Sequence, residues 1–229
     1  VGLAEERANA VRRFLVQLIV DLHCHSTVSD GLLSPEALVR RAAGNGVSLL
    51  SLTDHDGVSG LARARAEAKT VGMRFVNGVE ISIEWGGAQV HLLGYRFDAD
   101  DAALTAGLAS IHSGRIVRAR SMSASLEKIG IPGCFEGAMR FAENPELISR
   151  AHFARHLAAT GVCKDVRSVF DSYLVPGKPG YVEHRWPTVA EADGWIVGAG
   201  GIAAVAHPAR YAFSRGEMRK LLDEFKQCG

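Results

Sequence analysis

The chain has few cysteines, and none of them forms a closely spaced pair. Its 229 residues include only four, Cys24, Cys134, Cys163 and Cys228, with no Cys-x-x-Cys motif among them. This spacing argues against a disulfide framework and against a structural zinc knuckle. Scarce, unpaired cysteines are typical of a reducing compartment, and we therefore expect the protein to be cytoplasmic.

The sequence also lacks an excess of charge of either sign. Its 26 basic and 25 acidic residues give a formal net charge of +1, which argues against a general nucleic-acid or membrane surface. The apolar segment 14–20 is short, contains Gln17 and runs at once into Asp21, so it predicts neither a membrane span nor a signal peptide. We expect no membrane contact and no stable protein partner.

What the sequence does contain is an alternation of strands and helices. Hydrophobic residues make up 47% of the chain, enough for one large domain or for one domain with an insertion. The pattern predicts strands at 18–24, 47–53, 73–79, 80–85, 88–96 and 202–206, and helices at 35–43, 59–70, 188–198 and 214–227. Ser34 and Pro35 mark the first of these helices as N-cap and first-turn residue. This order is typical of an α/β sheet or barrel.

The middle of the chain has a different character. Residues 101–128 and 135–172 carry apolar side chains at three- and four-residue spacing, which predicts helices. We therefore expect a barrel formed by 18–97 and 191–229, and a helical insertion over 98–190 that covers its mouth. Residues 1–17 are a leader without an assigned role.

Metal-type side chains follow several of the expected strands. His23 and His25 lie on the same face of the first strand, because side chains alternate along a strand. His55 follows the second strand and Glu80 the third. If the strands are parallel, their carboxyl ends meet at one mouth, so these side chains should converge there. Mixed nitrogen and oxygen ligands suit zinc, manganese or iron, and a bridging carboxylate suits more than one ion.

Other polar residues have less distinctive interpretations. Ser26 and Ser29 lack a His–Asp relay, so we expect no serine nucleophile. Asp54 and Asp56 flank His55, and we expect them to orient ligands rather than to bind metal. The arginines of the first long helix are interpreted as a solvated face, with a phosphate contact as the alternative.

The motifs resemble those of a known family. Leu22-His23-Cys24-His25-Ser26, Thr53-Asp54-His55-Asp56, Gly78-Val79-Glu80 and Val205-Ala206-His207-Pro208 resemble successive motifs of the PHP (polymerase and histidinol phosphatase) family. Segments 148–153 and 176–182 resemble the branch that removes the 3′-phosphate from nucleoside 3′,5′-bisphosphates. The resemblance implies an α/β fold, a distorted (β/α)7 barrel. It also implies two or three divalent ions, manganese first, with iron, zinc and magnesium as alternatives.

The resemblance also assigns roles to single residues. Its implied metal ligands are His23, His25, Asp30, His55, Glu80, His91 and His152, with Glu80 as the bridging carboxylate. Its implied substrate-binding residues are Arg150, Lys178 and His207. A metal-activated hydroxide, rather than a protein side chain, is the expected nucleophile. A further Asp-x-His motif and the last barrel strands of the family have no counterpart before Gly229, so we expect an incomplete barrel and reduced activity.

The implied function is a phosphatase acting on a small nucleotide such as adenosine 3′,5′-bisphosphate. One alternative is stepwise 5′-to-3′ removal of nucleotides from short RNA at the same site. Another is a non-catalytic metal-binding PHP module.

Overall fold

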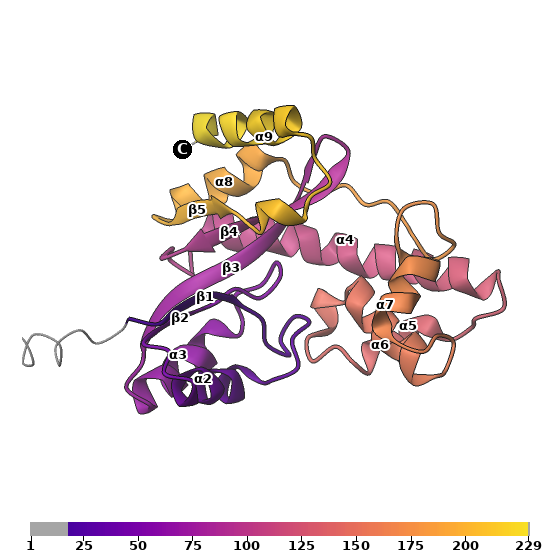
Figure 1. Cartoon of the computed structure of the whole chain (residues 1–229), viewed down its shortest axis with the longest axis horizontal. Coiled ribbons are helices and arrows are strands. Elements are labelled where there is room, and N and C mark those ends of the chain that lie inside the picture. Colours follow the sequence, from indigo (N-terminus) through magenta and orange to yellow (C-terminus); the bar gives the residue numbers. More distant parts are fainter. Residues whose placement is uncertain (1–17, 229) are drawn as a thin grey trace, which may run out of the picture.

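A five-stranded mixed sheet forms the centre of the protein (Figure 1). The computed structural model describes residues 18–228. The strands follow one another in chain order: β1 (Val20–Cys24), β2 (Leu49–Leu52), β3 (Arg74–Trp85), β4 (Ala88–Tyr95) and β5 (Ile202–Val205). Neighbours β1, β2 and β3 are parallel, whereas β4 is antiparallel to both β3 and β5. The predicted α/β class is thus confirmed, and the predicted leader 1–17 lies outside the described residues.

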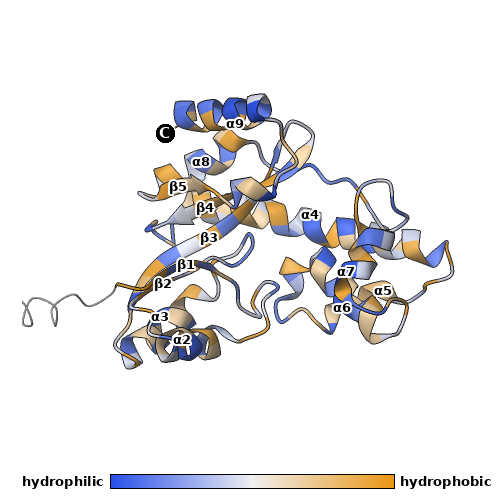
Figure 2. Cartoon of the chain, viewed as in Figure 1, coloured by the Kyte–Doolittle hydropathy of each residue, from blue (hydrophilic) through white to orange (hydrophobic). Residues whose placement is uncertain are grey.

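Helices lie on both sides of this sheet. In Figure 1, α2 (Pro35–Gly44) and α3 (Leu61–Thr70) lie below it, and α8 (Val189–Gly198) and α9 (Arg215–Cys228) lie above it. The predicted start of α2 is confirmed, because the Ser34 hydroxyl accepts a hydrogen bond from the amide of Ala37 at 3.3 Å. Figure 2 shows hydrophilic residues over most of the outward surface of α9. None of the described helices is long and apolar enough to cross a membrane.

Strand β3 differs from its prediction. Separate strands at 73–79 and 80–85 were expected, but Arg74–Trp85 forms one continuous strand. Its first half pairs with β2, and its second half pairs with β4 through the tight turn at Gly86 and Gly87. Glu80 therefore lies within a strand rather than beyond one. His91 likewise lies within β4, opposite Ser82. The expectation that Glu80 follows the end of the third strand is therefore wrong, whereas His91 lies within the strand predicted at 88–96.

The predicted helix at 135–172 is broken into short pieces. These are α5 (Cys134–Met139), a 3-10 turn (Pro145–Leu147), α6 (Arg150–Ala159), α7 (Val166–Val169) and a π turn (Phe170–Leu174). Pro145 lacks the amide hydrogen that a continuous helix needs, and Gly161 adopts a φ of +78°. The preceding helix, α4 (Ala102–Glu127), is continuous as predicted.

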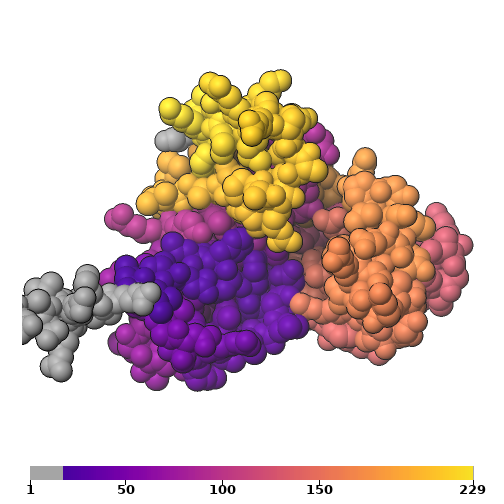
Figure 3. All heavy atoms as spheres, in the orientation of Figure 1, coloured from indigo at the N-terminus to yellow at the C-terminus, as the bar shows by residue number. Residues whose placement is uncertain are grey.

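The structure contains two hydrophobic cores, and α4 contributes to both. Leu104, Leu108 and Ile111 pack with the sheet. Met122 and Leu126 pack instead with the helices of residues 116–182, which we call the helical lobe. Figure 3 shows much of this lobe, in orange, beside the indigo and yellow parts of the chain. Helix α4 begins in the core beside the sheet and ends in the core of the helical lobe, so it connects the lobe to the sheet.

Strands β2 and β3 approach closely at Gly78. A Cβ atom at Gly78 would lie 2.7 Å from the carbonyl oxygen of Leu52 and 2.8 Å from the side chain of Thr53. Gly78→Ala should therefore lower the free energy of unfolding by about 1–3 kcal/mol, the usual cost of overpacking, as measured by urea denaturation. Gly194→Ala is the matched control. It lies on an exposed face of α8 with open space around it, and should raise the free energy by up to about 1 kcal/mol. An unaffected Gly78→Ala variant would contradict the close approach.

Candidate active site

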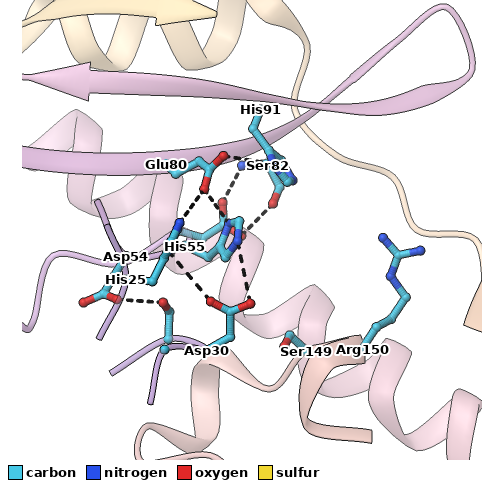
Figure 4. A network of polar contacts seen from close by, with 12 residues as sticks. His25, Asp30, Asp54, His55, Glu80, Ser82, His91, Ser149 and Arg150 are labelled. Carbon is cyan, nitrogen blue, oxygen red and sulfur yellow. Dashed lines mark hydrogen bonds and ion pairs between the residues drawn. The ribbon is translucent and has the colours of Figure 1, made fainter. Parts of the chain in front are cut away.

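Glu80 is surrounded by imidazoles and is only 1% exposed. Its Oε2 lies 3.1 Å from Nε2 of His23 and 3.1 Å from Nε2 of His25. Its Oε1 lies 3.1 Å from Nδ1 of His91 and 2.8 Å from Nε2 of His207. Figure 4 shows Glu80 at the centre of the contacts with His25, His55 and His91. One buried carboxylate of β3 thus joins side chains from β1 and the residue after it, from β4 and from the segment after β5.

His55 and Asp30 extend this arrangement on one side. Nδ1 of His55 lies 3.5 Å from Oε2 of Glu80. The two carboxylate oxygens of Asp30 lie 3.8 Å from Nδ1 of His25 and 3.9 Å from Nε2 of His55. Figure 4 shows Asp30 pointing toward both imidazoles. We call the whole set the Glu80 cluster; it consists of His23, His25, Asp30, His55, Glu80, His91 and His207.

The donor set of the Glu80 cluster fits divalent metal ions. Two groups, His23–Glu80–His207 and His25–His55–Glu80, have ligand atoms within 4.8 Å of one another. Both groups contain Glu80, as a carboxylate bridging two ions would require. In addition, the buried Nδ1 atoms of His25 and His55 have no hydrogen-bond partner among the described residues. Nitrogen and carboxylate ligands of this kind suit zinc, manganese and iron.

Electrostatics within the cluster favour the metal-binding forms of Glu80 and His55, whereas the carboxylates beside His25 favour its protonated form. Burial would raise the pKa of Glu80, but hydrogen bonds from His23, His25 and His91 hold it far below its usual range. Burial lowers the pKa of His55 to about 4, so this imidazole is neutral at pH 7. Burial also acts to lower the pKa of His25, but Glu80 and Asp30 raise it overall. A carboxylate anion and a neutral imidazole are the forms that coordinate cations.

Two aspartates beside His55 hold the surrounding loops. Asp54 accepts hydrogen bonds from the amide of Ser26 at 2.7 Å and from the hydroxyls of Ser26 and Ser29 at 2.6 and 2.7 Å. Asp56 accepts from the amide of Ser82 at 2.6 Å and forms an ion pair with Arg115. Both carboxylates are buried. They therefore support the loops that carry the ligands instead of joining the Glu80 cluster.

The structure does not bring every expected ligand into these groups. His152 is fully buried but belongs to neither group. Its Nδ1 accepts a hydrogen bond from the amide of Ser149 at 3.1 Å, as part of the cap of α6. That nitrogen is thus already engaged, and a role for His152 in metal binding stays a prediction.

Of the three expected substrate-binding residues, two lie at the Glu80 cluster or the cavity in front of it, and one does not. Arg150 lines the cavity in front of the Glu80 cluster, where it donates to Oε1 of Gln89 at 3.0 Å. His207 contacts Glu80 itself. Lys178 is exposed and does not line that cavity or the one next to it. Its predicted phosphate contact is not tested by this placement.

A second cavity adjoins the first and is rich in arginine. We call it the arginine cavity; its polar lining includes Ser82, Arg115, Arg118, Ser149 and Arg150. The two cavities share residues of the Glu80 cluster, together with Gln89, Arg150 and Phe170. An anionic substrate in one cavity can thus extend into the other.

Two of these arginines have no carboxylate partner among the described residues. Arg118 donates from Nε to the carbonyl of Val182 at 2.9 Å and lies over the rings of Tyr181 and Trp186. Burial, with Arg150 and Arg115 nearby, lowers the pKa of Arg118 to about 10, and burial also lowers the pKa of Arg150. Both remain cations at pH 7. Because a buried, uncompensated charge is costly, this cavity favours an anion.

The inward placement of Arg115 and Arg118 was missed at the level of sequence. A signal for it exists, because Ile111, Arg115, Arg118 and Met122 follow one another at helical spacing. Ile111 and Met122 are buried on α4, so the two arginines lie on the same inward stripe. An arginine within an apolar stripe of a helix predicts a buried cation.

Comparison with known proteins agrees with this geometry. A family model for the PHP domain matches residues 21–174. The chain belongs to the PHP family. The earlier resemblance to PHP motifs is thereby confirmed.

Two of the curated relatives differ in the activity that their names give. A 3′,5′-nucleoside bisphosphate phosphatase of Chromobacterium violaceum is 54% identical over 92% of this chain and 74% of its own length. A 5′-3′ exoribonuclease of Haemophilus influenzae is 43% identical over 91% of this chain and 76% of its own length.

Two solved structures have the same fold as this chain. An amidohydrolase from Chromobacterium violaceum, with sulfate bound and no metal, superimposes with a TM-score of 0.90 at 54% identity. The match covers 92% of this chain and 74% of that one. A protein from Bifidobacterium adolescentis, provisionally assigned to the metal-dependent phosphoesterases, gives a TM-score of 0.84 at 25% identity. Here the coverage is 93% of this chain and 75% of that one.

The central position of Glu80 leads to a test by metal binding. Glu80→Gln removes the negative charge that both donor groups share, so the affinity for manganese should fall by at least about a hundredfold. Equilibrium dialysis followed by elemental analysis measures the bound metal. Glu84→Gln, the same change on an exposed side chain of β3, should leave the metal content unaltered. Full metal occupancy in Glu80→Gln would refute the bridging role.

Proposed function

We propose that the protein is a metal-dependent phosphatase that removes the 3′-phosphate from nucleoside 3′,5′-bisphosphates such as adenosine 3′,5′-bisphosphate. The observation that carries this proposal is the arginine cavity beside the Glu80 cluster. A bisphosphate has two anionic groups separated by a ribose. One phosphate would lie at the cluster, and the other would face Arg118 and Arg150. The proposed setting is the cytoplasm, and manganese is the first candidate for the bound ions.

Different residues of the chain would bind the metal ions and orient the nucleotide. The residues of the Glu80 cluster would hold the ions: His23, His25, Asp30, His55, Glu80, His91 and His207. When bound, divalent ions would activate water and offset the negative charge that builds up on the phosphate. Arg150, which lines both cavities, would orient the nucleotide between them.

No protein nucleophile is needed in this reaction. Burial, together with Asp21 and Asp54, raises the pKa of the Cys24 thiol to about 12, so it is not a thiolate at pH 7. The hydroxyls of Ser26 and Ser29 both donate to Asp54, which supports a loop. These residues therefore do not supply an activated nucleophile, and water remains as the attacking group.

Stepwise cleavage of short RNA from its 5′ end is a second candidate. The cavity at the Glu80 cluster is open, and Phe170 and Tyr211 on its wall could stack on bases. The exoribonuclease name of the Haemophilus relative also favours it. A non-catalytic module is less well supported, because the donor set and the adjoining cationic cavity occur together.

Phosphate release from a small panel of substrates distinguishes these functions. With manganese present, adenosine 3′,5′-bisphosphate should yield AMP and phosphate at least about tenfold faster than 3′-AMP, because only the bisphosphate reaches the arginine cavity. Release of mononucleotides from a 5′-phosphorylated RNA trimer, without hydrolysis of the bisphosphate, would favour the exoribonuclease instead. Inactivity on the whole panel, with metal bound, would leave the non-catalytic module.

Arg118 offers a direct test of recognition of the second phosphate. Arg118→Met should raise KM for adenosine 3′,5′-bisphosphate by about 10- to 100-fold, since one charged hydrogen bond contributes about 1.5–3 kcal/mol. Hydrolysis of 3′-AMP should change much less. Steady-state kinetics on both substrates measure the difference. Arg120→Met, on the exposed side of the same helix, should match the unmodified protein. Equal losses on both substrates would contradict this assignment.

A further inference from the structure

The loop that carries Asp30 is held by hydrogen bonds within its own backbone and by Asp54, which follows β2. The amides of Gly31 and Ser29 both donate to the carbonyl of Ser26, at 2.8 and 3.2 Å. A Cβ atom at Gly31 would collide with the backbone of His25 and Ser26. Asp54 holds Ser26 and Ser29 from the side of β2. The start of the loop is thus fixed by the sheet.

The other side of this loop is held by the helical lobe. The guanidinium of Arg155, on α6, donates to the backbone carbonyls of Asp30 and of Gly31, the latter at 3.4 Å. The hydroxyl of Thr27 donates to Glu143, which lies between α5 and α6. The lobe therefore contacts the loop at two separate points, and one of them is the backbone of Asp30 itself.

The carboxylate of Asp30 has little else to fix its direction. Among the described residues, its recorded partners are His25 and His55, at 3.8 and 3.9 Å. These distances are too long for hydrogen bonds. Its position must then follow from its backbone, and the donor that reaches that backbone carbonyl is Arg155.

We propose that Arg155 is a positioning residue that holds Asp30 toward His25 and His55. The helical lobe, and not the sheet alone, would then determine how fully a metal ion occupies the position formed by His25, His55 and Glu80, which lies beside Asp30. This proposal rests on the proposed metal dependence. The position formed by His23, Glu80 and His207 contains no residue of this loop and should not depend on Arg155.

Manganese binding to the purified protein tests this role without any substrate. In calorimetric titration, Arg155→Met should weaken one binding step by about 10- to 100-fold, the usual effect of losing a group that orients a ligand. The other step should keep its affinity. Arg155→Lys, which keeps a cationic donor, should recover part of the loss. Arg167→Met, an exposed arginine of α7, should bind manganese like the unmodified protein.

A double-mutant cycle with Asp30 separates positioning from general destabilisation. If Arg155 acts through Asp30, Asp30→Asn should weaken the same step, and adding Arg155→Met should weaken it little further. Circular dichroism and metal-free melting of all variants serve as the folding control. If Arg155→Met melts below the assay temperature, Arg155→Gln and Arg155→Lys provide the comparison.

Three results would overturn the proposal. They are unchanged manganese binding in Arg155→Met, equal weakening of both steps, and additive effects of the two substitutions. The proposed function is judged separately. The unmodified protein could bind manganese in two steps, with one step weakened by Arg155→Met, and yet release no phosphate from bisphosphates. That result would contradict the phosphatase assignment and leave the positioning role of Arg155 intact.

Discussion

The rest of the site depends on one buried carboxylate, that of Glu80. Removing an ionised carboxylate from water costs several kcal/mol even after the protein relaxes, so the charge must be compensated locally. Four imidazoles meet its two oxygens at 2.8–3.1 Å. They come from β1, from β4 and from the segment after β5, which can converge only because β3 carries Glu80 through the middle of the sheet. The order of strands thus brings to Glu80 the imidazoles that compensate its charge.

Sequence patterns could reveal much of this arrangement, but not the full length of β3 or the change of its pairing partner along that length. Alternation along a strand placed His23 and His25 on one face, and both reach Glu80. The start of α2 was readable because Ser34 and Pro35 act through local hydrogen bonding and local geometry. In contrast, separate strands were expected at 73–79 and 80–85, whereas β3 is continuous and Gly78 allows its close contact with β2. Strand β3 pairs with β2 along its first half and with β4 along its second half. Tertiary packing determines this change of partner, so local sequence patterns do not predict it.

The charged residues of α4 and of the helical lobe were the least predictable part for a similar reason. Arg115 pairs with Asp56, 59 positions away, and no local motif connects them. Arg118 is recognisable as buried only when the inward stripe of α4 is traced through Ile111 and Met122. Lys178 was inferred from a motif; its side chain is exposed, and its phosphate contact stays a prediction. Motif spacing therefore located the groups around Glu80 better than those around the second cavity.

The sheet and the helical lobe contribute different chemistry, and they meet at a small set of shared residues. Glu80 and the imidazoles come from the sheet side, whereas Arg118 and Arg150 come from α4 and α6. The same α6 carries Arg155, which contacts the backbone of Asp30. A change of residues facing the arginine cavity could thus alter which anion is accepted while the Glu80 cluster stays as it is. A change that moves α6 has a wider effect, because it shifts Arg150 and Arg155 together. Arg118 of α4 faces the arginine cavity without contacting the support of His55, whereas Arg115 of the same helix pairs with Asp56 and Arg150 and Arg155 are coupled through α6.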